Sequence, residues 1–362
     1  MDVLLSLPIV SYLLAPAVTS WSTSLNLLFF YLTWSTLILS YSPLRIELFG
    51  TLAIRIIFWL LPSLLFLTFD IILPSLAESI KFGGSRALPP RDAKVLGKTL
   101  LLALLNLTLE TALEAGISLG LTTYFRTPFF KTSTTLPLPW QLIKQVVSLI
   151  MAREALTYYI HRYTLHSNKS PRASSKTDKS VGKIANLHGK YAHARSAPPF
   201  SLALAADHPV PFLLHRFLPI YLPALVIRPH LLTYFLFVVL VTGEETLSMS
   251  GYNIVPGIIM GGMARRCAIH YSKGHTSTSG NYGAWGLLDW SHGTSLGKDA
   301  IDDMKDEAEK HQLKERGGRA ASDAMDTINE GIGTWKKGRA KGRKGKKTAS
   351  ESESESDSDF IE

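Results

Sequence analysis

The sequence is poor in two residue classes that soluble enzymes use freely. Its 362 residues contain one cysteine, Cys267, and charged residues make up only 19% of the chain. A soluble globular protein usually carries about 25% charged residues. The single cysteine excludes a disulfide framework and any metal site built from several thiolates. The shortage of charge is concentrated, because no Asp, Glu, Lys or Arg occurs between Val3 and Leu44; an ordinary cytosolic enzyme is therefore excluded.

Long apolar runs are what the chain has instead. At a rise of about 1.5 Å per residue, the uncharged stretch alone could cross a bilayer core of roughly 30 Å about twice. The predicted membrane-spanning helices are 3–19, 22–40, 52–74, 98–122 and 136–160, with a helical pair within 209–242. We therefore expect an all-α membrane protein, a multipass helical bundle.

Charge divides the chain into parts. The segment from Ile301 to Glu362 holds 13 basic and 15 acidic residues, a net charge of −2. Because the whole chain has a net charge of +9, the first 300 residues have a net charge of +11. A basic block, Lys336 to Lys347, and an alternating Ser-acidic run, Ser350 to Asp359, predict disorder because they bury too little apolar surface. We expect an N-terminal transmembrane pair at 1–48, a membrane-embedded domain at 49–300 and a charged, largely disordered cytosolic tail at 301–362.

The basic loops predict orientation. Between Arg162 and Arg195 the chain has eight basic residues and one acid, Asp178. Such loops stay on the cytosolic side of a membrane. The basic block of the tail is expected to be solvated, and anionic lipid headgroups suit it better as a partner than nucleic acid does. One span, 98–122, contains Glu110 and Glu114 one helical turn apart, which predicts either a face turned toward other helices or a polar substrate or proton contact.

Six of the eleven histidines form three pairs with one spacing, H-x4-H. The pairs are His161 and His166, His188 and His193, and His270 and His275. Each pair follows an apolar segment or lies in a basic loop, so the chain should bring all six to one membrane face as a cytosolic histidine-rich cap. Neutral imidazole is a good ligand for iron, zinc, copper or nickel, and the six therefore predict a metal site.

The spacing sets a geometric condition on that site. Residues five apart on an ideal α-helix point about 140° from each other. An H-x4-H pair on one straight helix would therefore straddle a site, or the helix would have to end between the two histidines.

The histidines and the residues around them resemble the fatty acid hydroxylase superfamily, which includes sterol desaturases. The resemblance spans about 145–296, and its strongest part is the run Gly280 to Trp290, GNYGAWGLLDW, closed by Gly293-Thr294. Ser196-Ala197-Pro198 and Asp207-His208-Pro209 are also similar. The resemblance implies a helical bundle of the endoplasmic reticulum membrane with a cytosolic dimetal site that uses O2 and electrons from a partner to oxidise a lipid C–H bond.

Three positions depart from the family pattern. The second and third histidine boxes of the family end in adjacent histidines, where this chain has Ala192 and Gly274, and Met249 replaces a further histidine before Ser250-Gly251-Tyr252. Compensating candidates are Glu245 as an oxygen ligand, His208 and His292 as further imidazoles, and Asp289 and Asn281 as groups that orient ligands.

The favoured hypothesis is an iron-dependent membrane oxidoreductase that hydroxylates or desaturates a sterol or a fatty acyl chain. One or two iron ions fit, and zinc fits the same imidazoles. Expected partners are the lipid substrate, the membrane and an electron donor such as a cytochrome b5-type carrier. An alternative is a catalytically degenerate relative that binds lipid or acts as a scaffold. A multipass transporter is disfavoured, because the histidines lie in hydrophilic loops and not within the spans.

Overall fold

The computed structural model describes residues 21–255, 259–275 and 279–310. The chain forms two compact units, one ending at Asp303 and the other beginning at Met304. The predicted span 3–19, the basic block, the Ser-acidic run and His311 lie outside the described residues. Helix α15 (Ala300–Lys310) covers the first ten residues of the predicted tail.

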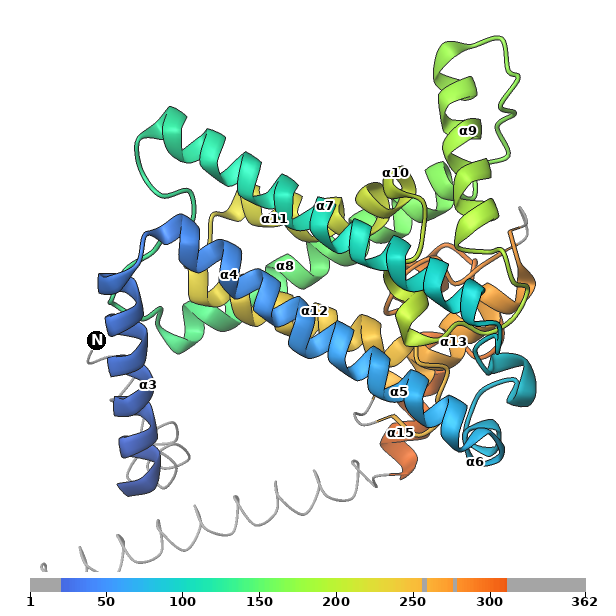
Figure 1. Ribbon diagram of the computed structural model, residues 1–362, viewed down its shortest axis with the longest axis horizontal. Coiled ribbons are helices and arrows are strands. Elements are labelled where there is room, and N and C mark those ends of the chain that lie inside the picture. The colour runs from blue at the N-terminus through green and yellow to red at the C-terminus, as the bar shows by residue number, and fades with distance from the viewer. Residues whose placement is uncertain (1–20, 256–258, 276–278, 311–362) are drawn as a thin grey trace, which may run out of the picture. The chain divides into compact units, whose positions relative to one another are not determined.

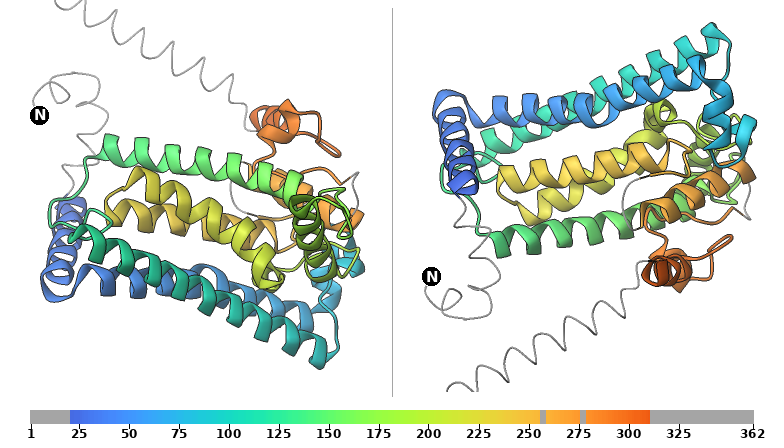
Figure 2. Two further views of the ribbon diagram at one scale, coloured as in Figure 1. Left: turned by 90° about the horizontal axis from the view of Figure 1, so that it is seen from above. Right: turned by 90° about the horizontal axis from the view of Figure 1, so that it is seen from below.

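All regular elements of the described residues are helices, which confirms the all-α fold class. Long helices run side by side, and shorter helices gather at one end of them (Figures 1 and 2). The elements before the first histidine pair are α3 (Trp21–Ser40), α4 (Pro43–Arg55), η1 (Ile56–Leu60), α5 (Leu61–Ile72), α6 (Pro74–Ser79), η2 (Gly84–Ala87), α7 (Ala93–Phe125) and α8 (Pro139–Ile160). The elements after it are η3 (His161–Leu165), α9 (Lys176–Tyr191), η4 (Ser201–Ala205), α10 (Pro209–Phe212), η5 (Leu213–Phe217), α11 (Leu218–Ile227), α12 (Leu231–Ser248), α13 (Met260–Lys273) and α14 (Leu287–Ser291).

Four helical stretches in the described residues are long and apolar enough to cross a membrane, as expected of a multipass protein. They are 43–72, 93–125, 209–227 and 231–248. The first starts nine residues before the predicted 52–74, so the predicted domain boundary after residue 48 falls inside α4. The predicted span 136–160 corresponds to α8, which is a helix but is not among the four, and α3 contributes only a shorter apolar segment, Leu28–Ser40.

Helix starts follow local chemistry. The Asp92 carboxylate accepts a hydrogen bond of 2.8 Å from the Lys94 amide and caps α7. Proline occupies the first position of α4 and α8, where a missing N–H costs nothing.

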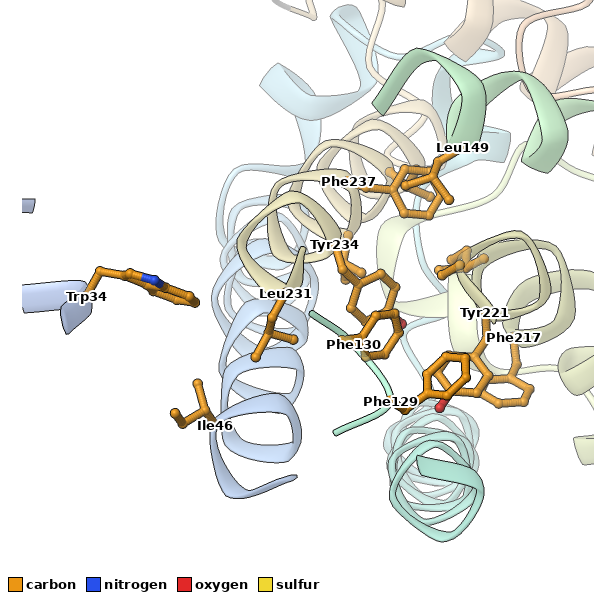
Figure 3. Packing of buried hydrophobic residues seen from close by; sticks show 14 residues of the cluster. Trp34, Ile46, Phe129, Phe130, Leu149, Phe217, Tyr221, Leu231, Tyr234 and Phe237 are labelled. Atoms are coloured by element: carbon orange, nitrogen blue, oxygen red, sulfur yellow. The ribbon is translucent and has the colours of Figure 1, made fainter. Parts of the chain in front are cut away.

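Two apolar clusters hold the bundle together. The larger one is built around Phe130, whose ring stacks on Tyr234 with centroids 4.5 Å apart, and includes Tyr221 and Phe237 (Figure 3). The second contains Trp59, packs η1 and α7 against η4, and includes residues beside the histidine pairs. Burying such side chains contributes roughly 1.5–3 kcal/mol each, so the second cluster fixes the cap on the helices.

Charged side chains are buried within the membrane-spanning helices. Arg55 of α4 lies 3.1 Å from the Glu110 carboxylate and 2.6 Å from that of Glu114, both on α7. The Tyr234 hydroxyl donates a hydrogen bond of 2.6 Å to Glu114. The predicted face turned toward other helices is therefore confirmed, and it joins α4, α7 and α12.

Arg55→Met is expected to destabilise the protein by about 3–5 kcal/mol, because it leaves two buried carboxylates without their cation. Thermal unfolding of the purified protein in detergent measures the change. Lys144→Met removes a cation from an exposed position on α8 and is the matched control. Equal melting temperatures for the two variants would contradict a stabilising role for the Arg55 cluster.

Candidate metal centre

The six paired histidines meet at one end of the helices. Ring centroids are 4.7 Å apart for His161 and His270, and His166 lies 5.0 Å from His193 and 4.8 Å from His275. His188 is 5.0 Å from His193. Four of them, His161, His166, His193 and His270, are buried and offer ring nitrogens within 4.8 Å of one another, a group able to hold a metal ion.

A π-helical turn brings the first pair together. Helix α8 passes at His161 into η3, in which the His166 amide donates to the His161 carbonyl at 2.9 Å. This i→i+5 bond places residues five apart above one another, whereas an α-helix would separate them. Turns of this kind occur frequently at functional sites.

The other two pairs lie at helix ends. Helix α9 ends at Tyr191, between His188 and His193, and α13 ends at Lys273, between His270 and His275. Gly274 then turns the chain with φ 71° and ψ −172°. The geometric condition set by the five-residue spacing is met in one case by a π turn and in two cases by the end of a helix.

Hydrogen bonds to ring Nδ1 orient three of the imidazoles. Nδ1 of His161 donates to the Tyr282 carbonyl at 2.9 Å, and Nδ1 of His270 donates to the Gly280 carbonyl at 2.8 Å. Nδ1 of His188 donates to the Asp207 carboxylate at 2.6 Å. Each Nε2 then carries a lone pair, and none of the three has a hydrogen-bond partner among the described residues. Buried ring nitrogens held this way suit metal ligation.

His275 is held in the opposite sense. Its Nε2 donates to the Leu165 carbonyl at 2.8 Å, so its lone pair is on Nδ1. Gly189 makes room for the ring, because a Cβ at Gly189 would lie only 2.7 Å from it.

The loop after the third pair supplies the carbonyls that orient His161 and His270. Asp289 accepts hydrogen bonds from the Tyr282 amide at 2.9 Å and the Gly283 amide at 2.7 Å. The Thr294 hydroxyl donates to the same carboxylate at 2.7 Å. Asn281, at φ 58°, donates to the Arg266 and Leu296 carbonyls. Asp289 and Asn281 thus act on the imidazoles through the loop backbone.

A second carboxylate, that of Asp207, orients His188, the first histidine of the second pair. Asp207 follows η4, and the turn around it is tied to α7 by Asn106, whose amide donates to the Ala205 and Asp207 carbonyls at 2.7 Å each. Asp207 in turn orients His188. The sequence singled out Asp207 as part of a similar segment but gave it no role; its structural task is to fix an imidazole.

Burial keeps the imidazoles of His161, His193 and His270 neutral. It lowers the pKa of His161, with a further lowering from the neighbouring His215, and lowers the pKa of His193 in the same way beside His270. Burial lowers the pKa of His270 to about 4. These rings are therefore unprotonated at neutral pH, the form that binds metal.

The structure adds a seventh imidazole. His215, in the π-helical turn η5, has its ring centroid 4.2 Å from that of His161 and 6.1 Å from that of His188. It has no partner five residues away, so the pair pattern could not find it. Its position eight residues after Asp207 within a segment similar to the family was the one available signal.

The other candidate ligands have different tasks. The Glu245 carboxylate forms ion pairs with Arg153 at 2.5 Å and Arg216 at 2.9 Å, so the prediction of an oxygen ligand gives way to a structural ion pair. His208 caps α10 by accepting from the Val210 amide. His292 packs on Tyr158 and Tyr159.

The three positions at which the family has a histidine and this chain does not differ in burial and backbone conformation. Met249 is buried, with its sulfur 3.4 Å from that of Cys267. Ala192 continues α9 with helical angles. Gly274 has a backbone conformation that residues with a Cβ rarely adopt, and a Cβ there would lie 3.0 Å from the Ser196 hydroxyl.

Comparison with known proteins identifies the region that contains these residues. Residues 146–294 match the fatty acid hydroxylase family, close to the predicted 145–296. No solved structure matches the chain. The match contains all seven clustered histidines and both orienting carboxylates, Asp207 and Asp289.

His161→Ala and His275→Ala are each expected to lower metal content of the purified protein, and His215→Ala should do the same. Loss of a ligand should weaken metal binding by more than the 10–100-fold that loss of an outer hydrogen-bond partner typically costs. Elemental analysis after dialysis measures it. His208→Ala is the matched control, and a loss of metal in that variant equal to that in His161→Ala would contradict the assignment. His311→Ala, outside the described residues, is also predicted to leave metal content unchanged.

Gly274→His places a histidine where the third histidine box of the family has one. This substitution is expected to destabilise the protein and to add no metal ligand. The positive φ alone should cost about 1–3 kcal/mol. Gly274→Ala isolates that backbone cost, and Ala192→His tests a family position whose backbone is already helical. Thermal unfolding and metal content are the measurements. A Gly274→His protein that is as stable as wild type and binds more metal would overturn this reading.

Proposed function

Residues 146–294 form a fatty acid hydroxylase domain, and from this premise we propose that the chain is an iron-dependent membrane oxidoreductase that hydroxylates or desaturates a lipid. The observation that carries the proposal is the buried imidazole group, in which Nε2 of His161, His188 and His270 has no hydrogen-bond partner among the described residues. Lone pairs left unused in a buried site are costly unless an ion or a proton meets them.

The donor set fits iron. Every candidate ligand is an imidazole nitrogen, and this type of ligand suits iron, with zinc as the competing ion. Nitrogens of four histidines lie close enough together to bind one ion. The remaining clustered imidazoles are compatible with either one ion or two. Iron bound there would supply the O2 chemistry, while the protein supplies binding, orientation and exclusion of water.

The reaction needs electrons from outside the chain. Hydroxylation converts a C–H bond, O2, two electrons and two protons into C–OH and one water, and desaturation converts two C–H bonds with the same reagents into C=C and two waters. A cytochrome b5-type carrier is the proposed electron donor. The proposed substrate is a sterol or a fatty acyl chain, which would enter from the membrane between the apolar helices.

The chain's own residues prepare the site. Asp207 and the loop held by Asp289 fix ring orientation before any ligand arrives. Burial of His161, His193 and His270 keeps bulk water away from the nitrogens. Such fixed dipoles in a water-poor site need little rearrangement during a reaction.

The proposed location is the endoplasmic reticulum membrane, with the histidine end and the tail in the cytosol. The basic loop from Arg162 to Arg195 supports this orientation, because it contains His166, His188 and His193.

A second candidate function is a lipid-binding or scaffold protein without turnover. Met249, Gly274 and Ala192 favour it, because three family ligand positions lack histidine. The two functions differ in whether the natural chain oxidises lipid.

Lipid oxidation by the purified protein distinguishes them. Iron-loaded protein in lipid nanodiscs, given a reduced electron donor and isotopically labelled O2, is expected to place one labelled oxygen in a lipid or to create a double bond, read by mass spectrometry. His161→Ala should reduce the product to background, and His208→Ala should retain it. Folded, iron-loaded protein that oxidises no lipid from a total membrane extract would favour the scaffold function.

A further inference from the structure

Four tyrosine rings form a continuous row that ends at the clustered histidines. Tyr163 and Tyr159 stack with ring centroids 6.2 Å apart, and the Tyr159 ring lies 5.3 Å from that of Tyr158. The Tyr158 ring is 6.3 Å from that of Tyr282, which in turn lies 5.6 Å from the ring of His161. Every step is within the roughly 4.5–7 Å over which aromatic rings interact directly.

The two ends of this tyrosine row differ in exposure. Tyr163 is 57% exposed and Tyr159 44%, whereas Tyr158 is fully buried and Tyr282 is 5% exposed. Tyrosine is common where a membrane helix meets water, and this accounts for Tyr159 and Tyr163 at the end of α8 and in η3. It does not account for the buried rings. The row therefore joins an accessible surface to a buried site.

The Tyr158 hydroxyl has a route for its proton. It lies 3.2 Å from Thr294 Oγ1, and the Thr294 hydroxyl already donates to the Asp289 carboxylate at 2.7 Å. A hydroxyl has one hydrogen, so Thr294 must accept the hydrogen bond of Tyr158. Both distances suit proton transfer. Burial raises the pKa of Asp289, which makes its carboxylate a better proton acceptor.

Such a route matters for the redox chemistry of a phenol. A phenol that gives up an electron becomes a strong acid, so it is oxidised most easily where a base takes its proton at the same time. Tyr252 also donates to a carboxylate, that of Asp70, at 2.7 Å, but its printed ring neighbours are Phe66 and Phe69, which are much harder to oxidise. Tyr158 combines a proton acceptor with oxidisable rings on both sides.

We propose that the tyrosine row is a redox relay, in which Tyr158 is transiently oxidised while single electrons pass from the surface at Tyr159 and Tyr163 to the histidine centre. The relay rests on the proposed function, because an iron centre activated by O2 is the oxidant that it serves. The surface end is where a one-electron carrier meets the chain.

The transfer balances in two steps. The oxidant takes one electron from Tyr158 through the ring of Tyr282. The phenolic proton passes by way of Thr294 to Asp289, which leaves a neutral tyrosyl radical. One electron from the carrier then reaches the radical through the exposed rings, and the proton returns from Asp289. Each cycle moves one electron inward and restores every side chain.

Light-driven oxidation under nitrogen tests the relay without O2 and without lipid. Zinc-loaded and iron(II)-loaded proteins are flashed with a ruthenium tris-bipyridyl sensitiser and a sacrificial electron acceptor, which together remove one electron from surface rings. In zinc-loaded protein a persistent radical at Tyr158 is expected, read by electron paramagnetic resonance. In iron(II)-loaded protein the radical should decay faster, because bound iron(II) is oxidised to iron(III) as the phenol is restored. Unflashed samples correct for iron oxidised by the acceptor directly.

Matched variants assign the radical to this row. Tyr158→Phe should lose the persistent radical and slow the light-driven oxidation of iron. Thr294→Val should do the same by removing the proton route, and Thr294→Ser should restore both. Tyr252→Phe is the control, because Tyr252 is also a buried tyrosine that donates to an aspartate but lies outside the row; it should behave as wild type. Metal content of each variant checks that the histidine site is intact.

Equal radical yield and equal iron oxidation in wild type and Tyr158→Phe would overturn the proposal. So would an equal loss of radical in Tyr252→Phe. If Tyr158→Phe binds less metal, the comparison of Thr294→Val with Thr294→Ser decides the question, and equal radical yield in those two variants would contradict the relay. Because neither O2 nor lipid is used, a chain that oxidises no lipid would leave this result readable.

Discussion

Hydrogen bonds from ring Nδ1, which leave Nε2 of the same imidazole for a ligand, are the constraint on which the rest of the site depends. A buried, neutral ring can rotate and can carry its proton on either nitrogen, and only a fixed acceptor decides which nitrogen faces inward. Here the acceptors are the carbonyls of Tyr282 and Gly280 and the carboxylate of Asp207. The carbonyls stay in place because Asp289 binds the loop amides, and Asp207 stays because Asn106 ties its turn to α7. The geometry of the site is thus set by backbone loops as much as by helices.

The membrane-spanning helices contribute through buried ion pairs as well as apolar packing. Arg55 joins α4 to α7, and Arg153 and Arg216 meet at Glu245 of α12. Removing one member of such a buried ion pair is strongly destabilising, because it leaves the other charge without a partner. Arg153, Arg216 and Glu245 also line a small cavity together with His161.

Much of this arrangement could be predicted from the sequence, and the exceptions have physical reasons. The three H-x4-H pairs predicted a meeting of six imidazoles because each follows an apolar stretch or lies in a basic loop, and uncharged runs predicted the helices that carry them. Span limits were less predictable, since Arg45 and Glu47 interrupt the apolar pattern before residue 52, whereas the folded bundle buries Glu47 and leaves Arg45 exposed. His215 was missed because it is single and reaches the site through a π turn. Glu245 was a candidate ligand because it lies one helical turn before Met249, and its ion pairs could not be predicted because Arg153 and Arg216 are distant in sequence.

The conformation of Gly274 also limits how the site could be redesigned. Most ligand positions can be changed by substituting a side chain while the backbone stays in place. At φ 71° and ψ −172° the main chain of Gly274 has angles that favour a residue without a Cβ, and a Cβ built there would lie 3.0 Å from the Ser196 hydroxyl. An engineered ligand at this position would therefore require the backbone and its surroundings to change together, whereas Ala192 has helical angles that other side chains also accept.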